Sequence, residues 1–87
     1  MTNSKKQMLT ALGSLVRKRR KHLNISQEEL AYRCNLDRTY ISGIERGKRN
    51  PSFTIIVQLA VGCEDTVSGL LSSLEGEMQD GRDADLP

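Results

Sequence analysis

The amino-acid sequence predicts an all-α fold of five helices around one small core. Apolar residues recur at the helical spacings of three, four and seven positions through most of the chain. Short runs of Ser, Asn, Asp and Gly separate these periodic stretches and match the residues that begin and end helices. With only seven Gly and two Pro in 87 residues, the composition argues against a turn-rich β-sandwich and leaves room for a single domain.

The first two helices are expected to begin at capping serines. Ser4 opens a capping box with the Gln three positions later, and the apolar spacing behind it predicts a helix over about 5–23. Ser26 opens a second box, in which Glu29 is expected to reach back to the backbone of the capping residue. The second helix is therefore predicted over about 27–34.

The ends of the first three helices are predicted at residues that tolerate a left-handed backbone. Asn24 and Asn35 follow the first and second helices, and Gly47 follows a third helix expected over about 38–46. Asp37 stands at the start of the third helix, where its side chain is expected to cap the free amides.

Two further helices are predicted before an acidic segment. Ser52 is expected to cap a fourth helix over 53–62, and Thr66 a fifth helix with apolar residues at i, i+3, i+4 and i+7. The periodic stripe then stops, and residues 75–87 are predicted to form a disordered acidic tail. The folded domain is accordingly expected to span residues 1–74.

The second and third predicted helices have the pattern of a helix-turn-helix. Three residues join them, and counting from Gln27 puts a small residue, Ala31, at the fifth position. The ninth position, in the turn, is Asn35, and the fifteenth and eighteenth are the apolar Ile41 and Ile44. Together these four constraints are much more specific to a helix-turn-helix than any one of them alone.

The segment SQEELAYRCNLDRTYISGIERGKRNPS resembles the Cro/cI (Xre-type) helix-turn-helix family. In that family helix 2 reads SQ-x-x-LA, helix 3 reads YIS-x-x-E-x-G, and a P-S pair opens helix 4. The resemblance extends over about residues 13–71, and within it NLDRTYISGIER is similar to the controller proteins of restriction–modification systems. It implies a lambda-repressor-like DNA-binding domain and a homodimer that binds an operator to regulate its own operon. The chain departs from the family at Cys63-Glu64-Asp65, where Leu-Gly-Val is common.

The distribution of charge indicates a polyanionic partner. Residues 1–50 hold twelve Lys and Arg against four Asp and Glu, whereas residues 51–87 hold one Arg against seven acidic residues. The net charge of +2 therefore conceals a strongly basic first half. A double-stranded DNA operator is the polyanion that the resemblance implies.

The resemblance implies that the first residues of the third helix contact bases in the major groove. Arg38 has the two donors that match guanine O6 and N7, and Thr39 offers a hydroxyl and a methyl group. Three roles are open to Tyr40: a core residue, a phosphate contact through its hydroxyl, or a base contact.

Phosphate or minor-groove contacts are expected from both ends of the motif. Gln27 stands at the N-terminus of the second helix, where free amides favour an anion. Gly43 has no side chain and is expected to let the backbone come close to DNA. The other candidates lie on or just after the third helix: Ser42, Arg46, Lys48, Arg49 and Asn50. The alternative for these residues is a solvated basic loop without DNA contacts.

One ion pair is expected to be structural. The resemblance implies that Arg20, on the first helix, pairs with Glu45, on the third, and a buried charge needs such a partner. Glu45 is thus predicted to hold helices together rather than to act in catalysis. The remainder of the basic run over 17–22 is expected to be a solvated helix face.

No catalytic, metal or cofactor site is expected. The sequence has no glycine-rich phosphate loop, no HExxH motif and a single His, and nothing in it indicates a small-molecule substrate. Cys34 and Cys63 are far apart, without CxxC spacing, and are expected to be buried thiols. The start, MTNSKKQ, lacks the apolar stretch of a signal peptide, and no apolar run reaches the length of a membrane span. We therefore expect a cytoplasmic protein without a membrane partner.

Apolar residues on the last two helices predict a homodimer, because one recognition helix touches too few base pairs for useful specificity. The expected interface residues are Ile55, Val57, Val61, Val67, Leu71 and Leu74. The RNA polymerase sigma subunit is a further candidate partner. Two alternatives stay open: a phage-type repressor or antitoxin with the same fold, and an interaction module that contacts polymerase without DNA specificity.

Overall fold

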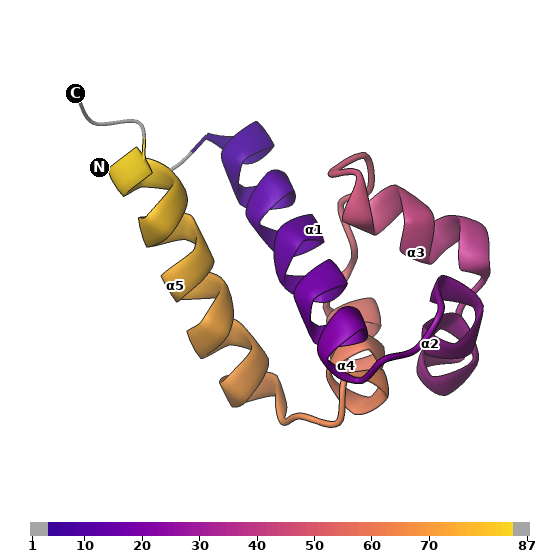
Figure 1. The fold of residues 1–87 in the computed structure, drawn as a ribbon. Coiled ribbons are helices and arrows are strands. Elements are labelled where there is room, and N and C mark those ends of the chain that lie inside the picture. The colour runs from indigo at the N-terminus through magenta and orange to yellow at the C-terminus, as the bar shows by residue number, and fades with distance from the viewer. Residues whose placement is uncertain (1–3, 85–87) are drawn as a thin grey trace.

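The computed structural model describes residues 4–84, with side chains as far as Gln79. These residues form five helices joined by short turns. Figure 1 shows their order: α1 (Lys5–His22), α2 (Gln27–Cys34), α3 (Arg38–Glu45), α4 (Phe53–Gly62) and α5 (Val67–Ala84). No strand occurs among these residues, so the all-α prediction is confirmed. The bounds of α2 and α4 are those predicted, whereas α1 and α3 each end one residue early.

The helices are arranged around α1. Helix α5 lies beside α1 and runs in the opposite direction (Figure 1). Helix α3 packs on another side of α1 and also contacts α2. Helix α4 contacts both α2 and α5. The helix-turn-helix pair is therefore held by α1 and α4, at a distance from most of α5.

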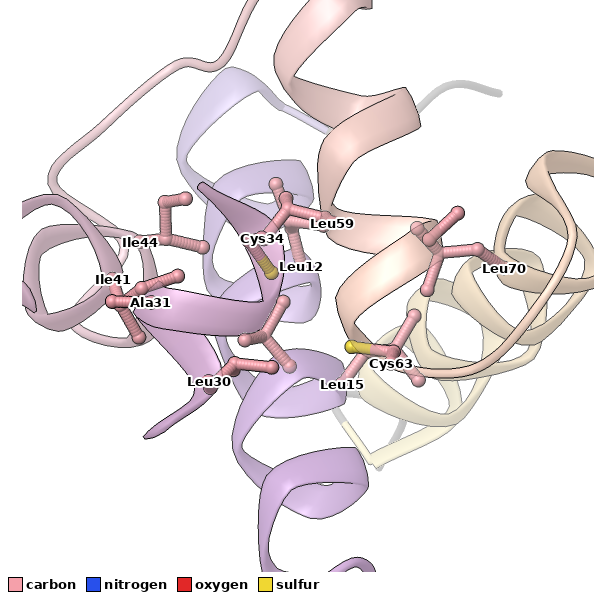
Figure 2. Close-up of a cluster of buried hydrophobic side chains, with 12 residues drawn as sticks. Leu12, Leu15, Leu30, Ala31, Cys34, Ile41, Ile44, Leu59, Cys63 and Leu70 are labelled. Carbon is pink, nitrogen blue, oxygen red and sulfur yellow. The ribbon is translucent and has the colours of Figure 1, made fainter. Parts of the chain in front are cut away.

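One apolar cluster joins all five helices (Figure 2). Its most deeply buried members come from every helix: Val16, Leu30, Cys34, Ile41, Ile44, Leu59 and Leu70. Cys34 and Cys63 are both free and buried, as predicted. Burial raises the pKa of the Cys34 thiol to about 12, so at neutral pH this side chain is a small apolar group in the core.

Serine caps begin the first two helices, but only one forms a complete capping box. Ser4 Oγ accepts from the Gln7 amide at 3.1 Å, and Gln7 Oε1 accepts from the Ser4 amide at 2.8 Å. Ser26 Oγ accepts from the Glu29 amide at 3.0 Å. The Glu29 carboxylate accepts instead from Arg33 Nε at 3.0 Å, so the second box is only half formed.

The side-chain caps predicted for α3 and α4 are wrong. Asp37 occupies the capping position of α3, but its side chain makes no capping bond, and its backbone carbonyl accepts two amides of the first turn at 3.0 and 3.1 Å. The Ser52 hydroxyl bonds the Thr54 hydroxyl at 3.1 Å instead of a helix amide. Extended backbone at these two residues sets both helix starts. Thr66 does cap α5, since its Oγ1 accepts from the Gly69 amide at 3.0 Å.

Four helices are followed by the same backbone device, a residue in the left-handed region. The residues are Asn24, Asn35 and Glu64, with φ of 58°, 58° and 60°, and Gly47, with φ of 72°. The first three helix ends were predicted from Asn and Gly. Glu64 stands where the family that the sequence resembles commonly has Gly, and its positive φ is a conformation that a residue with a Cβ disfavours.

Helix α5 continues to Ala84, which corrects the prediction of a disordered segment from residue 75. Residues 85–87 of that predicted tail lie outside the described part of the chain. Part of this extension contacts α1. Lys18 Nζ lies 2.7 Å from Glu77 Oε2, so a residue of the acidic segment pairs with the basic face of α1. Composition alone suggested a solvated tail because it does not reveal this neighbour.

Replacing Glu64 with Gly is expected to stabilise the protein by about 0.5–1 kcal/mol. A residue with a Cβ pays about 1–2 kcal/mol to adopt the left-handed backbone. Glycine avoids this cost but loses more chain entropy on folding, by roughly 0.5–1 kcal/mol, so the exchange is favourable on balance. The Glu64→Gly change also removes an exposed ion pair with Arg33 (3.0 Å), whose contribution is a few tenths of a kcal/mol. Denaturant unfolding at equal protein concentration measures the difference. Asn35→Gly is the control, since Asn already tolerates this conformation, and a lower unfolding midpoint for Glu64→Gly contradicts the explanation.

Candidate nucleic-acid interface

The helix-turn-helix consists of α2, the turn at 35–37 and α3. Ala31 is buried on α2, and its carbonyl accepts the amide that follows the left-handed Asn35 at 2.8 Å. Ile41 and Ile44 are fully buried and fasten α3 to the core. All four positions that defined the motif in the sequence therefore have the predicted environment.

The Glu45 carboxylate is the point at which α1, α2 and α3 meet. Its side chain is 0% exposed and accepts from Arg20 Nε at 2.7 Å and Arg20 Nη2 at 3.0 Å. Gln27 Nε2 donates to it at 3.0 Å, and Arg17 Nε lies 3.4 Å away. The predicted Arg20–Glu45 pair is confirmed, and it is one part of a larger network that also uses Gln27 and Arg17.

Electrostatics favour an ionised Glu45. Burial by itself would raise the pKa of this carboxyl, but hydrogen bonds from Arg20 and Gln27 outweigh burial and hold the pKa below its ordinary value. The same contact with Glu45 raises the pKa of Arg20. Among the described residues, no buried side-chain nitrogen or oxygen lacks a hydrogen-bond partner, so the buried charge is fully satisfied.

Gln27 links the buried carboxylate to the start of α3. While its amide nitrogen donates to Glu45 at 3.0 Å, its amide oxygen lies 3.5 Å from Arg38 Nη1, a long hydrogen bond. The order Glu45, Gln27, Arg38 thus runs from the interior to the exposed first residue of α3. Sequence reasoning placed Gln27 at a helix N-terminus but did not foresee that its side chain is engaged within the protein.

The exposed beginning of α3 carries the three predicted base-contacting residues. Arg38 and Thr39 are exposed, and Tyr40 is half-buried against the core cluster. The Arg49 guanidinium carbon lies 5.2 Å from the centroid of the Tyr40 ring, within the range of a cation–π contact. Tyr40 therefore belongs partly to the core and partly to the surface that α3 presents.

The candidate phosphate-contacting residues lie close to this surface. Arg46, Lys48, Arg49 and Asn50 are exposed, and Arg46 Nε lies 3.3 Å from Ser42 Oγ. Gly43, which was expected to let the backbone come close to DNA, is buried in the protein alone. The side chain of Arg49 covers it, and a Cβ added to Gly43 would lie 2.7 Å from Arg49 Cγ. In the protein alone, an arginine therefore occupies the space expected for DNA.

Comparison with known proteins agrees with this geometry. Residues 16–63, more than half of the chain, match the helix-turn-helix family model. The chain belongs to the Xre-type helix-turn-helix family of transcriptional regulators.

Its relatives in the helix-turn-helix family include controller proteins. Control protein C.MunI of a Mycoplasma species is 42% identical over 66 residues, which cover 75% of this chain and 89% of that protein. Control protein C.SmaI of Serratia marcescens is 39% identical over 61 residues, 70% of this chain and 73% of that protein. The solved tetramer of the restriction–modification controller protein C.Esp1396I, in complex with its natural 35 base-pair operator, is 36% identical. It matches with a TM-score of 0.77 over 83% of this chain and 95% of that one.

Apolar residues of α4 and α5 are divided between core and surface. Val61 and Leu71 are 65% and 44% exposed, in keeping with the predicted interface. Val57 is half-buried. The remaining candidates pack partly against the core: Ile55, Val67 and Leu74. These three have less surface to offer a partner than the sequence suggested, because each also serves the fold of the single chain.

Phe53 is an exposed residue that the sequence analysis did not select. It is 73% exposed and opens α4. Phe53, Val57 and Val61 are spaced four residues apart, so they share one face of the helix. The i, i+4, i+8 spacing of these apolar residues was a sufficient signal, although only Val57 and Val61 of this set were selected from the sequence.

Among the described residues, no single helix is both long and apolar enough to cross a membrane. Helix α4 and the segment Val67–Gln79 reach that length and composition only together, and they are bent by 97° at the break between them.

Removing the buried carboxylate is expected to destabilise the fold strongly. Glu45→Ala leaves Arg20 without its partner and should cost about 3–5 kcal/mol. The double change Arg20→Met with Glu45→Leu should recover much of this loss, because the buried charges disappear together. Thermal and denaturant unfolding test both, with Glu75→Ala, on the exposed surface of α5, as the control. An unfolding midpoint unchanged by Glu45→Ala contradicts the assigned role.

The lowered pKa of Glu45 also gives a direction for pH dependence. Because the pKa is lower in the folded than in the unfolded protein, acid protonates the unfolded state first. The contribution of Glu45 is therefore complete above the unfolded pKa of about 4.3 and is lost as pH falls from there through the folded pKa. Unfolding free energies measured at falling pH should converge for the wild type and for Arg20→Met with Glu45→Leu. Parallel curves would show that Glu45 does not contribute in this way.

Proposed function

We propose that this chain is a restriction–modification controller protein, a homodimer that binds operator DNA and regulates transcription of its own operon. The main support is the likeness to the C.Esp1396I tetramer in complex with its natural operator, over most of both chains. Likeness to control proteins of different organisms favours a controller over a phage-type repressor or an antitoxin. The proposal places the protein in the cytoplasm, includes the RNA polymerase sigma subunit as a partner and assigns no catalytic reaction.

In the proposed complex, α3 enters the major groove with its first turn towards the base edges. Arg38 donates to guanine O6 and N7 through two N–H groups, and Thr39 offers its hydroxyl or methyl group to a neighbouring base. Gln27 contacts the Arg38 side chain through a long hydrogen bond of 3.5 Å, so it restricts that side chain only weakly before DNA arrives. A restricted side chain loses less conformational entropy on binding, which supports a reading role for Arg38.

Phosphate contacts in the proposed complex come from residues around the reading turn. Arg46, Lys48 and Asn50 are exposed beyond α3, and Ser42 is on the helix beside Arg46. The backbone amides at the N-terminus of α2 attract a phosphate at the Gln27 end of the motif. These contacts fix the position of the protein on the duplex and account for most of the salt dependence of binding.

The proposed dimer brings together the exposed faces of α4 and α5. Phe53 and Val61 on α4, with Leu71 on α5, leave apolar surface uncovered in the single chain. Pairing by two-fold symmetry makes this surface self-complementary and puts two α3 helices on one face. Their half-sites would then lie about one turn of DNA apart, roughly 34–36 Å.

Loss of Arg38 and loss of Arg46 are both expected to weaken DNA binding, but with different dependence on sequence and on salt. Arg38→Ala should weaken binding to the operator by about 1–3 kcal/mol per half-site, weaken binding to scrambled duplex much less, and change the salt slope little. Arg46→Ala should weaken both duplexes similarly and reduce the slope of log K against log salt by about one per lost phosphate contact. Titration at several salt concentrations, with an operator selected from random duplexes, measures both effects. Equal weakening of both duplexes by Arg38→Ala would show that Arg38 contacts phosphate and that specificity lies elsewhere.

The assembly is expected to depend on the apolar face of α4 and α5. Wild-type protein should sediment as a dimer at micromolar concentration, whereas Val61→Lys should shift it towards monomer, because a buried, unpaired charge opposes association. Tyr32→Lys is the matched control, since Tyr32 is 82% exposed but lies on α2. A wild-type monomer at high concentration, both free and bound to DNA, contradicts the proposed dimer.

A further inference from the structure

Arg49 lies back across α3 although it is four residues beyond the end of that helix. The turn after α3 reverses the chain: the Gly47 amide donates to the Ile44 carbonyl at 3.0 Å, and the Lys48 amide donates to the Gly43 carbonyl at 2.8 Å. Gly47 takes the left-handed backbone that this turn requires. The chain that leaves the turn is thus directed past α3, and the Arg49 side chain lies against the helix.

Two residues of α3 hold Arg49 there, and we call Tyr40 and Gly43 together the Arg49 seat. The guanidinium lies over the Tyr40 ring, with 5.2 Å from its carbon to the ring centroid. The aliphatic part lies over Gly43, where an added Cβ would be 2.7 Å from Arg49 Cγ and 3.3 Å from Nε. The three closest atoms to that added Cβ all belong to Arg49. A side chain at Gly43 would therefore displace Arg49 without striking the backbone.

The seat is on the face of α3 that the proposed function assigns to DNA. Gly43 follows Thr39 by four residues, so Arg49 crosses the helix one turn after a proposed base contact. The cation–π contact with Tyr40 uses the charge of the guanidinium and consumes none of its five N–H donors, which stay available for other acceptors. Arg49 remains exposed in spite of these contacts. The arrangement presents a cation in a restricted position instead of on a free loop.

We infer that Gly43 is a positioning residue for sequence selectivity: because it lacks a Cβ, it seats Arg49 on Tyr40, and Arg49 and Tyr40 contact the operator as one unit. The inference rests on the proposed function and refines it. It moves Arg49 from the general phosphate contacts to the residues that discriminate between duplexes. It also explains a glycine in the middle of a short helix, where alanine is intrinsically more favourable.

The experiment is a double-mutant cycle. Gly43→Ala, Arg49→Ala and the combination are titrated against a selected operator and a scrambled duplex. Gly43→Ala and Arg49→Ala should each reduce the preference for the operator by about tenfold. The combined variant should be no worse than Arg49→Ala alone, since Gly43 acts through Arg49. The control is Gly76→Ala, a glycine of α5 with no neighbouring atom within 4 Å of an added Cβ, which should leave the preference unchanged.

A different outcome of the cycle identifies a different role. If Gly43→Ala weakens operator binding further in the Arg49→Ala background, Gly43 acts by letting DNA approach the backbone, and the inference is overturned. Thermal unfolding adds a second criterion. Gly43→Ala should unfold at the same or a higher temperature than the wild type, so its loss of selectivity cannot come from a damaged fold. A lower unfolding temperature would show that the glycine serves packing, against the inference.

A spectroscopic measurement tests the seat without DNA. The ring current of Tyr40 should shift the side-chain NMR signals of Arg49 in the wild type, and this shift should disappear in Gly43→Ala and in Tyr40→Leu. Unchanged Arg49 signals overturn the inference. A wild type that prefers no duplex overturns both the inference and the proposed function. If the wild type prefers its operator and Gly43→Ala prefers it equally, the proposed function stands and only the role of the Arg49 seat is overturned.

Discussion

The buried Glu45 carboxylate is the interaction on which the rest of the structure depends. A charge without contact with water is stable only when its oxygens are fully hydrogen-bonded, and the donors here come from α1 and α2. The position of α3 relative to both helices is thereby fixed by directional bonds, in addition to the non-directional packing of Ile41 and Ile44. Apolar packing alone permits small shifts of a short helix. The hydrogen bonds from Arg20 and Gln27 to the Glu45 carboxylate are directional, so they permit fewer such shifts.

Rigidity at Glu45 extends to the exposed face through short connections. Gln27 joins the carboxylate to Arg38 by a long hydrogen bond, and Arg49 lies against Gly43 and Tyr40, so the arginine that begins α3 and one that follows it both contact the rest of the motif. Helix α1 is also tied to α5 by the Lys18–Glu77 ion pair, and to the turn before α5 by the Arg19–Asp65 pair. The exposed apolar residues of α4 and α5 form the proposed dimer surface. One helix, α1, thus connects the reading face to the proposed dimer surface. In a two-fold dimer this connection sets the distance between the two α3 helices.

Much of this fold could be predicted from sequence because its determinants are local. Helical periodicity and the residues Asn24, Asn35 and Gly47 determine where helices end, and each acts on its own backbone. Predictions failed where the deciding contact was distant in sequence or depended on geometry. Composition gave no indication that Glu77 meets Lys18, or that Arg49 covers Gly43. The Arg20–Glu45 pair was predicted only through family resemblance, since no local pattern relates residues on separate helices.

The most direct test of the account is the pKa of Glu45 itself. Burial and hydrogen bonding act on this carboxyl in opposite directions, and the account requires hydrogen bonding to prevail. An NMR titration that follows the Glu45 side-chain carboxyl carbon measures the outcome in the intact protein. The account predicts a midpoint below the ordinary glutamate value of about 4.3. A midpoint above that value would mean that burial dominates, and that a weakly held carboxyl cannot be what fixes α3.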